Sequence, residues 1–393
     1  MLLVEMQRLG FMVNREGLLE YSDFLSDRMK EAEEAIYMLA GEEFNINSPK
    51  QLGTILFERL GLPHFKKTKS GYSTDADVMQ KLRKLHPIVD LILSYRQFSK
   101  LKSTYAEGLV KVISEKDGRI HSTFKQTLTM TGRLSSTEPN LQNIPVRTEL
   151  GRMFRKFFVA KEGHVLIDAD YSQIELRVLA HISGDPTLIA AFRDGEDIHA
   201  ITASQVFGVP LDSVSDEMRK RAKAVNFGIV YGISAFSLSE DIGVSRKEAG
   251  EYIDAYFRKY PMVRDYLDNT VKKAKEDGFV STLFGRRRYI PELAAKNKNL
   301  VAFGERVAMN TPIQGTAADI IKKAMVETDA ALKAAGMKAR LILQIHDELI
   351  VEAPEEEAEA ALALLKEKME NTVKLLVPLV ADANLGKSWF DAK

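Results

Sequence analysis

A short apolar run that ends in carboxylates constrains the fold of this chain more than any other stretch. Residues 165–167, Val-Leu-Ile, predict a buried strand, and Asp168 and Asp170 follow at its end. A strand fixed inside a sheet presents such acids at a rigid place, which suits a metal or phosphate site. Ser172 then opens a predicted helix, with Glu175 at the spacing of a capping box. An ordinary acid at a strand end and a helix cap explain the same stretch equally well.

Composition narrows the class of protein without naming a function. The chain has 393 residues, 45% of them hydrophobic, which is enough for roughly two to three domains. Basic and acidic residues are equal at 55 each and the pI is 7.1, so an anionic partner must be bound by local patches. The absence of cysteine excludes disulfides and thiolate chemistry. Glu5 interrupts any signal peptide and no apolar run reaches membrane-spanning length, so a cytoplasmic protein is expected.

A second acidic site is predicted between two apolar runs, 341–345 and 349–351, which have the pattern of paired strands. His346, Asp347 and Glu348 lie between them, where a hairpin turn ordinarily carries Gly, Asn or Pro. Charged groups at a tight bend between buried strands are typical of a functional site.

Two helices carry polar side chains at steps of four residues, which share one helix face. On the first, Arg219 and Lys223 are suited to phosphates, while Phe227 and Tyr231 offer flat surfaces for a base. An amphipathic helix with aromatic core residues is the alternative interpretation. The second helix carries the polar set Arg306, Asn310 and Gln314.

The remaining elements follow from apolar periodicity and turn residues. They are a helical segment over 1–43, a helix start at 48–49, a basic loop over 66–74, strands over 110–113 and 118–124, helices over most of 187–300 and a helix that begins at Pro354. Pro312 is predicted to kink or divide the helix that contains it. The polar, turn-rich segment 131–145 is predicted to be a functional loop, because long ordered loops commonly carry function.

Together these features describe nucleotidyl transfer. Divalent metals held by two carboxylates, cations for a triphosphate and a surface for a base are the parts that this reaction needs. The sequence also resembles family A DNA polymerases, and is similar to the polymerase region of the bacterial members. The resemblance is carried by Asp-Tyr-Ser-Gln-Ile-Glu-Leu-Arg at 170–177, by the motif at 219–232, by Gln-Ile-His-Asp-Glu at 344–348, and by the segments 131–145 and 312–316.

The resemblance implies an α+β, mainly helical fold shaped like a right hand. It places a thumb at 1–110, a palm with an antiparallel sheet at 111–186 and 303–393, and fingers at 187–302. It implies a DNA polymerase that adds deoxynucleotides to a primer 3′ end with release of pyrophosphate. Primer–template DNA and deoxynucleoside triphosphates are the implied partners, and a monomer without membrane attachment is expected. No exonuclease is expected, because the chain begins at the implied thumb.

The implied metal ligands are Asp170, Asp347 and the backbone carbonyl of Tyr171, which bind two Mg²⁺ ions, with Mn²⁺ as a substitute. Asp168 is left out of this set and Glu348 is a secondary carboxylate. Asp170, Asp347 and Lys223 are the implied catalytic residues. The residues implied to bind the nucleotide are Gln173, Glu175, His199, Arg219, Lys223, Phe227 and Tyr231. The residues implied to bind DNA are Arg133, Asn140, Gln142, Asn143, Arg306, Asn310, Gln314 and His346.

Some assignments stay open at the level of sequence. Glu175 is either a structural helix cap or the side chain that crowds a ribose 2′-hydroxyl, and the two roles are compatible. Phe227 in place of a tyrosine predicts poor use of dideoxynucleotides. A single-subunit RNA polymerase shares the motif layout, although Glu175 argues against it. A catalytically silent DNA-binding module is the alternative from another functional class.

Overall fold

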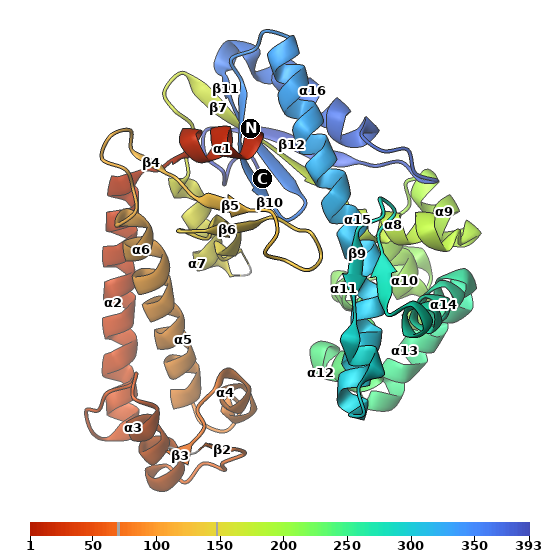
Figure 1. Ribbon diagram of the computed structural model, residues 1–393. Helices are drawn as coiled ribbons and strands as arrows, with labels where there is room; N and C mark the ends of the chain where they lie inside the picture. The colour runs from red at the N-terminus through yellow and green to blue at the C-terminus, as the bar shows by residue number, and fades with distance from the viewer. Residues whose placement is uncertain (69–70, 147) are drawn as a thin grey trace.

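The computed structural model describes residues 1–68, 71–146 and 148–393. Figure 1 shows an antiparallel sheet where two helical arms meet, with both chain ends beside the sheet. Helices outnumber strands along the described chain, and this sheet holds the longest strands, while the other strands form two-stranded pairs. The fold is therefore α+β and mainly helical, as the sequence predicts.

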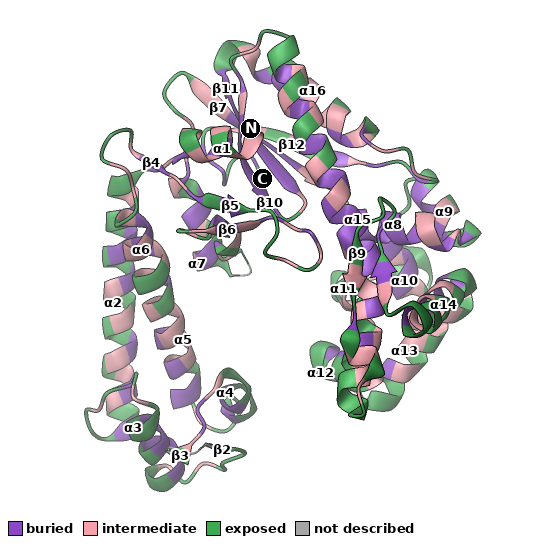
Figure 2. Ribbon diagram, in the orientation of Figure 1, coloured by how far each residue is buried: buried purple, intermediate pink, exposed green. Residues whose placement is uncertain are grey.

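The central sheet supports both acidic motifs. Its strands follow the order β10–β11–β7–β12, and every neighbouring pair is antiparallel. Because β7 lies between β11 and β12, its backbone is bonded along both edges, and Leu166 and Ile167 are fully buried. Figure 2 shows this burial along the strands. The strands are β7 (His164–Tyr171), β10 (Arg340–Ile345), β11 (Glu348–Pro354) and β12 (Ala381–Gly386).

The first arm is a pair of long helices with its own core at the far end. α2 (Arg15–Ala40) packs along α5 (Ile88–Lys100). Ile36, Leu52 and Ile92 belong to a core cluster separate from the main one. The other elements are π-helical turns Thr54–Arg59 and Leu101–Ala106, α3 (Pro49–Gly53), β2 (Lys67–Thr68), β3 (Gly71–Tyr72), α4 (Ala76–Leu82) and α6 (Glu107–Val110).

Some of the sequence predictions for this arm agree with the structure and others do not. Ser48 caps α3 as predicted, by accepting a hydrogen bond from the backbone N–H of Gln51. Part of the predicted basic loop over 66–74 forms the β2–β3 pair, and residues 69–70 of that loop lie outside the described residues. Of the strand predicted over 110–113, the structure keeps one antiparallel β-bridge, between Ile113 and Ile120. Val110 instead ends α6, which packs against α2, so tertiary contacts override the β-branched pattern there.

The predicted helix over 1–43 is also interrupted. α1 (Leu2–Leu9) ends at Gly10, which has φ +64°, and β1 (Phe11–Met12) follows. Asn14 then caps α2. β1 pairs with β4 in the connection between arm and sheet, so pairing with a distant strand breaks the helical pattern. The elements of this connection are β4 (Arg119–Ile120), β5 (Thr123–Lys125), β6 (Ser135–Thr137), α7 (Glu149–Arg152) and 3₁₀ turns Leu141–Asn143 and Met153–Phe157.

The second arm is helical, as predicted for 187–300. Ser215 caps α11 by accepting a hydrogen bond from the backbone N–H of Met218. The elements of this arm are α8 (Ile174–Ser183), α9 (Pro186–Arg193), α10 (Ile198–Phe207), α11 (Asp216–Val230), α12 (Ala235–Ile242), α13 (Arg246–Lys259), α14 (Pro261–Asp277), β8 (Phe279–Ser281), β9 (Arg287–Tyr289) and 3₁₀ turns Leu211–Ser213 and Pro291–Ala294.

α15 (Lys298–Ala334) joins the second arm to the sheet (Figure 1). Pro312 does not divide this helix, because packing against α14, α16 and β10 holds the turns on both sides of the proline. Pro354 does not open the last helix either. It ends β11 opposite His164, and a 3₁₀ turn, Glu355–Glu357, precedes α16 (Ala358–Asn371).

Candidate functional site

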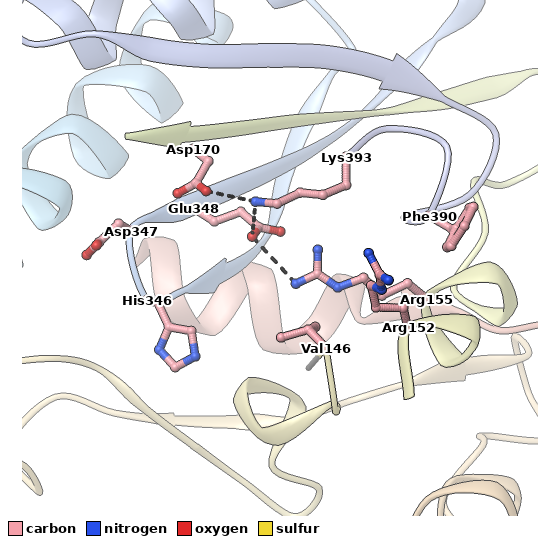
Figure 3. Close-up of a pocket in the computed structure, with 9 residues that line it drawn as sticks. All are labelled: Val146, Arg152, Arg155, Asp170, His346, Asp347, Glu348, Phe390 and Lys393. Carbon is pink, nitrogen blue, oxygen red and sulfur yellow. Dashed lines mark hydrogen bonds and ion pairs between the residues drawn. The ribbon is translucent and has the colours of Figure 1, made fainter. Parts of the chain in front are cut away.

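The two predicted acids meet at one end of the central sheet. Asp170 lies at the end of β7, and Asp347 lies in the turn between β10 and β11. The backbone N–H of Tyr171 donates to the carbonyl of Asp347 at 3.1 Å. His346 adopts φ +50° in the same turn. Asp170, His346 and Asp347 line a cavity of about 520 Å³ (Figure 3), so residues far apart in the sequence form one site.

The predicted capping box after β7 is wrong. Gln173 takes a left-handed conformation at φ +52° and begins α8, and its side chain makes no cap. The backbone N–H of Ser172 continues the edge of the sheet by donating to Val380. Glu175 is instead buried, and it accepts hydrogen bonds from Arg133 at 2.7 Å and from Tyr231 at 2.9 Å.

Charge around Asp347 is only partly compensated. Burial raises the pKa of Asp347 to about 6; the positive charge of Arg133 opposes this rise, and Glu175 and Asp170 add to it. The Arg133 guanidinium lies 3.8 Å from the Asp347 carboxylate. A further positive charge at this place would favour the ionised form of Asp347.

Asp168 and Glu348 form a buried network beside the cavity, and Glu348 also lines the cavity. The indole N–H of Trp389 donates to Glu348 at 2.7 Å and lies 3.2 Å from Asp168. Burial and the charge of Glu348 raise the pKa of Asp168. Burial opposes the ionised Glu348, but Arg155 and Lys393 lower its pKa. Glu348 is therefore held by protein groups, and Asp168 is held through one oxygen, while its Oδ1 is buried without a hydrogen-bond partner among the described residues.

Sequence reasoning missed several residues of this cavity. Arg155 and Lys393 both lie against Glu348, at 3.7 Å and 2.7 Å (Figure 3). Arg155 also stacks over Trp389, with 4.1 Å between the guanidinium carbon and the ring centroid. The one local signal in the sequence was an arginine among the aromatic residues of 153–158. Lys393 had no signal, because nothing in its neighbourhood pointed to the sheet. The other missed lining residues are Val146, Arg152 and Phe390.

The predicted cationic face of α11 is present and exposed. Arg219 pairs with Asp197 at 2.6 Å, and the Lys223 ammonium lies 5.9 Å from the centroid of the Phe227 ring. Phe227, Tyr231 and Arg306 line a second cavity of about 500 Å³ between α11 and α15. The aromatic side chains are therefore not simple core residues.

Two glycines at the end of α11 allow a close approach. A Cβ on Gly228 would lie 2.7 Å from Ile233, and a Cβ on Gly232, at φ +65°, would collide with Met309. The groups that come close to these glycines are the chain's own side chains.

His199 lies under this face rather than on it. It is buried, and the Asn226 amide lies 2.8 Å from its Nδ1. Burial lowers the pKa of His199 to about 4; Asp197 opposes the shift, and the positive charges of Lys223 and Arg219 add to it. The imidazole is thus neutral at pH 7.

The predicted DNA-binding residues come from α15 and from the loop before the sheet. Arg306 is exposed, while Asn310 and Gln314 are half-buried on α15. Asn140 caps the turn Leu141–Asn143, which includes Gln142 and Asn143. The Gln142 amide donates to the carbonyl of Gln344 at 3.4 Å, next to the His346 turn.

Several buried polar atoms near the two acids have no hydrogen-bond partner among the described residues. They include Arg155 Nε on the cavity wall and, close by, Arg133 Nε, Asp168 Oδ1, Gln173 Oε1 and Gln344 Oε1. Buried polar atoms nearly always have partners in folded proteins, so such a set fits a polar ligand that arrives from outside the chain.

The donor set suits a hard divalent cation. Two half-buried carboxylates at a cavity wall, with room for water, match the oxygen ligands that Mg²⁺ and Mn²⁺ prefer. Among residues 1–68, 71–146 and 148–393, no cluster of three or more acidic, histidine or cysteine side chains is arranged for a metal. The remaining ligands must then come from the backbone, water or substrate.

Comparison with known proteins shows the family of this chain. The family model of DNA polymerase family A matches residues 15–391. The chain belongs to DNA polymerase family A. Two similar family members are DNA polymerase I of Caldicellulosiruptor bescii, 55% identical over 391 residues, and that of Bacillus subtilis, 57% identical over 394 residues. Each comparison covers 100% of this chain but only 46% and 45% of those relatives.

A solved family A structure is also similar throughout. The polymerase domain of Pol1 from M. smegmatis, in complex with DNA primer–template and dNTP, has a TM-score of 0.94 and 47% identity. The match covers 100% of this chain and 69% of that one. Within the described part of this family A chain, no helix is both long and apolar enough to cross a membrane.

Proposed function

We propose that this chain catalyses template-directed DNA synthesis, adding deoxynucleotides to a primer 3′ end with release of pyrophosphate. The observation that carries the proposal is the meeting of Asp170 and Asp347 at one cavity wall. Family membership and the likeness to a polymerase domain that holds primer–template and dNTP support it. The exposed cations of α11 and the unpartnered polar atoms are consistent with an anionic, polar substrate.

In this proposal Asp170, Asp347 and the carbonyl of Tyr171 hold two Mg²⁺ ions, which Mn²⁺ can replace. Bound there, the metals supply activation of the attacking hydroxyl and stabilisation of the leaving pyrophosphate. The chain's own part is to fix the two carboxylates: β7 is bonded along both edges, and Tyr171 ties the strand end to the Asp347 turn.

The proposed nucleotide site extends from the sheet to α11. Arg219 and Lys223 bind the triphosphate as charge-assisted donors, with Lys223 as the catalytic cation. Phe227 and Tyr231 contact the sugar and base, and Glu175, held by Arg133 and Tyr231, crowds a 2′-hydroxyl. Gln173 and His199 complete the set, and His199 acts as a neutral group. Discrimination against dideoxynucleotides stays a prediction, which competition with deoxynucleotides tests.

The proposed DNA path lies along α15 and the loop before the sheet. Arg133, Arg306, Asn310 and Gln314 meet the minor groove, where acceptors look alike for every correct base pair. These donors test shape without reading sequence. Asn140, Gln142, Asn143 and His346 complete the DNA contacts. In this arrangement 1–110 is the thumb, 111–186 and 303–393 the palm, and 187–302 the fingers, which the two arms beside the sheet support (Figure 1).

Primer extension on a recessed DNA template with Mg²⁺ tests the proposal. Wild type is compared with Asp170→Ala and Asp347→Ala, and Asp254→Ala, an exposed carboxylate of α13, is the control. Wild type and control extend with deoxynucleotides, while the two site variants bind DNA and lose at least about 10³-fold in rate, because metal ligation supplies several kcal/mol.

Each other outcome rejects part of the proposal. If wild type binds DNA and never extends the primer, the chain is a DNA-binding module. A wild type that prefers ribonucleotides is an RNA polymerase. Extension by either site variant at the wild-type rate removes that carboxylate from the catalytic centre.

A further inference from the structure

Lys393 places a fixed positive charge inside the acidic cavity. Its ammonium donates to Asp170 at 2.9 Å and to Glu348 at 2.7 Å (Figure 3). The segment that carries it is anchored, because the backbone N–H of Trp389 donates to Phe158 at 2.8 Å and that of Phe390 donates to Arg155 at 3.2 Å. The reach of Lys393 into the cavity is therefore built into the fold.

The two partners of Lys393 differ in what else satisfies them. Glu348 is buried and also accepts from the Trp389 indole, with Arg155 nearby. Asp170 is half-buried at the cavity wall and is the proposed metal ligand. One ammonium is thus shared between a structural carboxylate and a functional one.

Each proposed metal carboxylate faces one internal cation. Lys393 lies on Asp170, and the Arg133 guanidinium lies 3.8 Å from Asp347. Without such charges, Asp170, Asp347 and Glu175 would repel one another across the cavity. The cations allow the carboxylates to hold their positions before any metal arrives.

We propose that the Lys393 ammonium competes with a divalent cation for Asp170 and so sets the metal affinity of the site. This inference rests on the proposed metal site. A metal at Asp170 removes one partner of Lys393, and the ammonium stays on Glu348. Lys393 acts on the metal through this carboxylate, which makes it a positioning residue rather than a catalytic one.

Mn²⁺ binding to the full chain, without DNA or nucleotide, tests the competition. The free ion is measured by electron paramagnetic resonance for wild type, Lys393→Met and Lys393→Arg. The matched control is Lys387→Met, since Lys387 pairs with the exposed Glu355, which follows the end of β11 opposite to Glu348, and neither residue lines this cavity. Lys393→Met is expected to bind Mn²⁺ roughly three- to tenfold more tightly, because it loses a competing half-exposed ion pair and a like charge. Lys393→Arg and the control remain near wild type.

A thermal melt of the same proteins gives a second readout. Metal-free Lys393→Met is expected to melt at a lower temperature than wild type, because its acids lose a counter-charge. Saturating Mn²⁺ then raises its Tm by more than it raises that of wild type, as linkage requires for the tighter binder. Unchanged or weaker Mn²⁺ binding by Lys393→Met overturns the proposal.

Asp170→Asn separates this inference from the proposed function. If Asp170→Asn binds Mn²⁺ as wild type does, the proposed metal site itself is wrong. If Asp170→Asn loses Mn²⁺ while Lys393→Met equals wild type, the metal site stands and only the competition is rejected.

Discussion

The sheet end and the α11 face support the two halves of the site in different ways. Asp170 sits on a strand that is bonded along both edges, above a buried network in which Arg155, Trp389 and Lys393 hold Glu348. Arg219 and Lys223 instead project from an exposed helix face, and Arg219 is 45% exposed in its pair with Asp197. The sheet end is preformed and partly neutralised by the chain's own cations, whereas the α11 face is exposed to an incoming ligand. Four substitutions test this contrast, from the largest expected change in free energy to the smallest.

Arg155→Met should lower the free energy of unfolding most, because it removes the buried cation that lies against Glu348 and the Trp389 ring. Breaking such a buried arrangement costs roughly 3 kcal/mol of unfolding free energy. Urea denaturation measures the loss, with Arg152→Met, an exposed neighbour in the same cavity, as the control. Equal stability of the two variants would mean that the sheet end is no more rigid than its surface.

Lys223→Ala should have the opposite profile, harming activity without harming the fold. Loss of a charge-assisted bond to a phosphate lowers kcat/KM for nucleotide roughly 10- to 100-fold. The unfolding free energy changes by less than about 0.5 kcal/mol, as for other exposed positions. Single-nucleotide incorporation kinetics measure the effect. Lys220→Ala, an exposed lysine off this helix face, is the control, and an equal loss there would reject a specific role for Lys223.

Asp197→Asn should make the α11 face bind the nucleotide more tightly. The carboxylate competes with a phosphate for Arg219, and an exposed pair is worth 0.2–1 kcal/mol, so KM for nucleotide falls by about two- to fivefold. Asparagine keeps the cap that Asp197 gives α10. Asp216→Asn, an exposed acid at the start of α11, should leave KM unchanged. A rise in KM for Asp197→Asn would show that Asp197 orients Arg219 instead.

His199→Gln should change the free energy of unfolding least at neutral pH, and its effect should grow as the pH falls. The folded pKa of His199 is about 4 against an ordinary 6.5, so the unfolded chain takes up the proton first as the pH falls. Above pH 6.5 the group contributes nothing, and between about 6.5 and 4 it destabilises the wild type progressively. Glutamine removes this loss. Urea denaturation at pH 7 and pH 5 checks it, and equal pH dependence of the two proteins would contradict a buried, neutral His199.

Local patterns located the two acids correctly for a physical reason. The apolar runs at 165–167 and 341–345 form buried strands, and the end of each strand fixes the position of the acid that lies there or just after it. The helical steps from Arg219 to Tyr231 were equally local, since helix geometry alone puts them on one face. The helix caps at Ser48 and Ser215 are local too, because each serine accepts a hydrogen bond from the backbone N–H three residues further along the chain.

Long-range contacts decided what local patterns misread. Glu175 fitted a capping box, but Arg133, 42 residues away, and Tyr231, 56 residues away, take both carboxylate oxygens. The helical pattern over 1–43 was broken by pairing with β4, and Pro312 stays within α15 because neighbouring elements hold that helix.

The sequence by itself determined the family, the mainly helical α+β class, the two acids, and the cations and aromatic residues of the α11 face. These depend on residue identity and on periods of two or four residues, which the chain carries locally. Only the tertiary structure decided how the charges are balanced. Glu175 accepts hydrogen bonds from Arg133 and Tyr231, His199 is buried and neutral, and Lys393 pairs with Asp170. Charge compensation depends on distance in space and on burial, and neither is written in the order of residues along the chain.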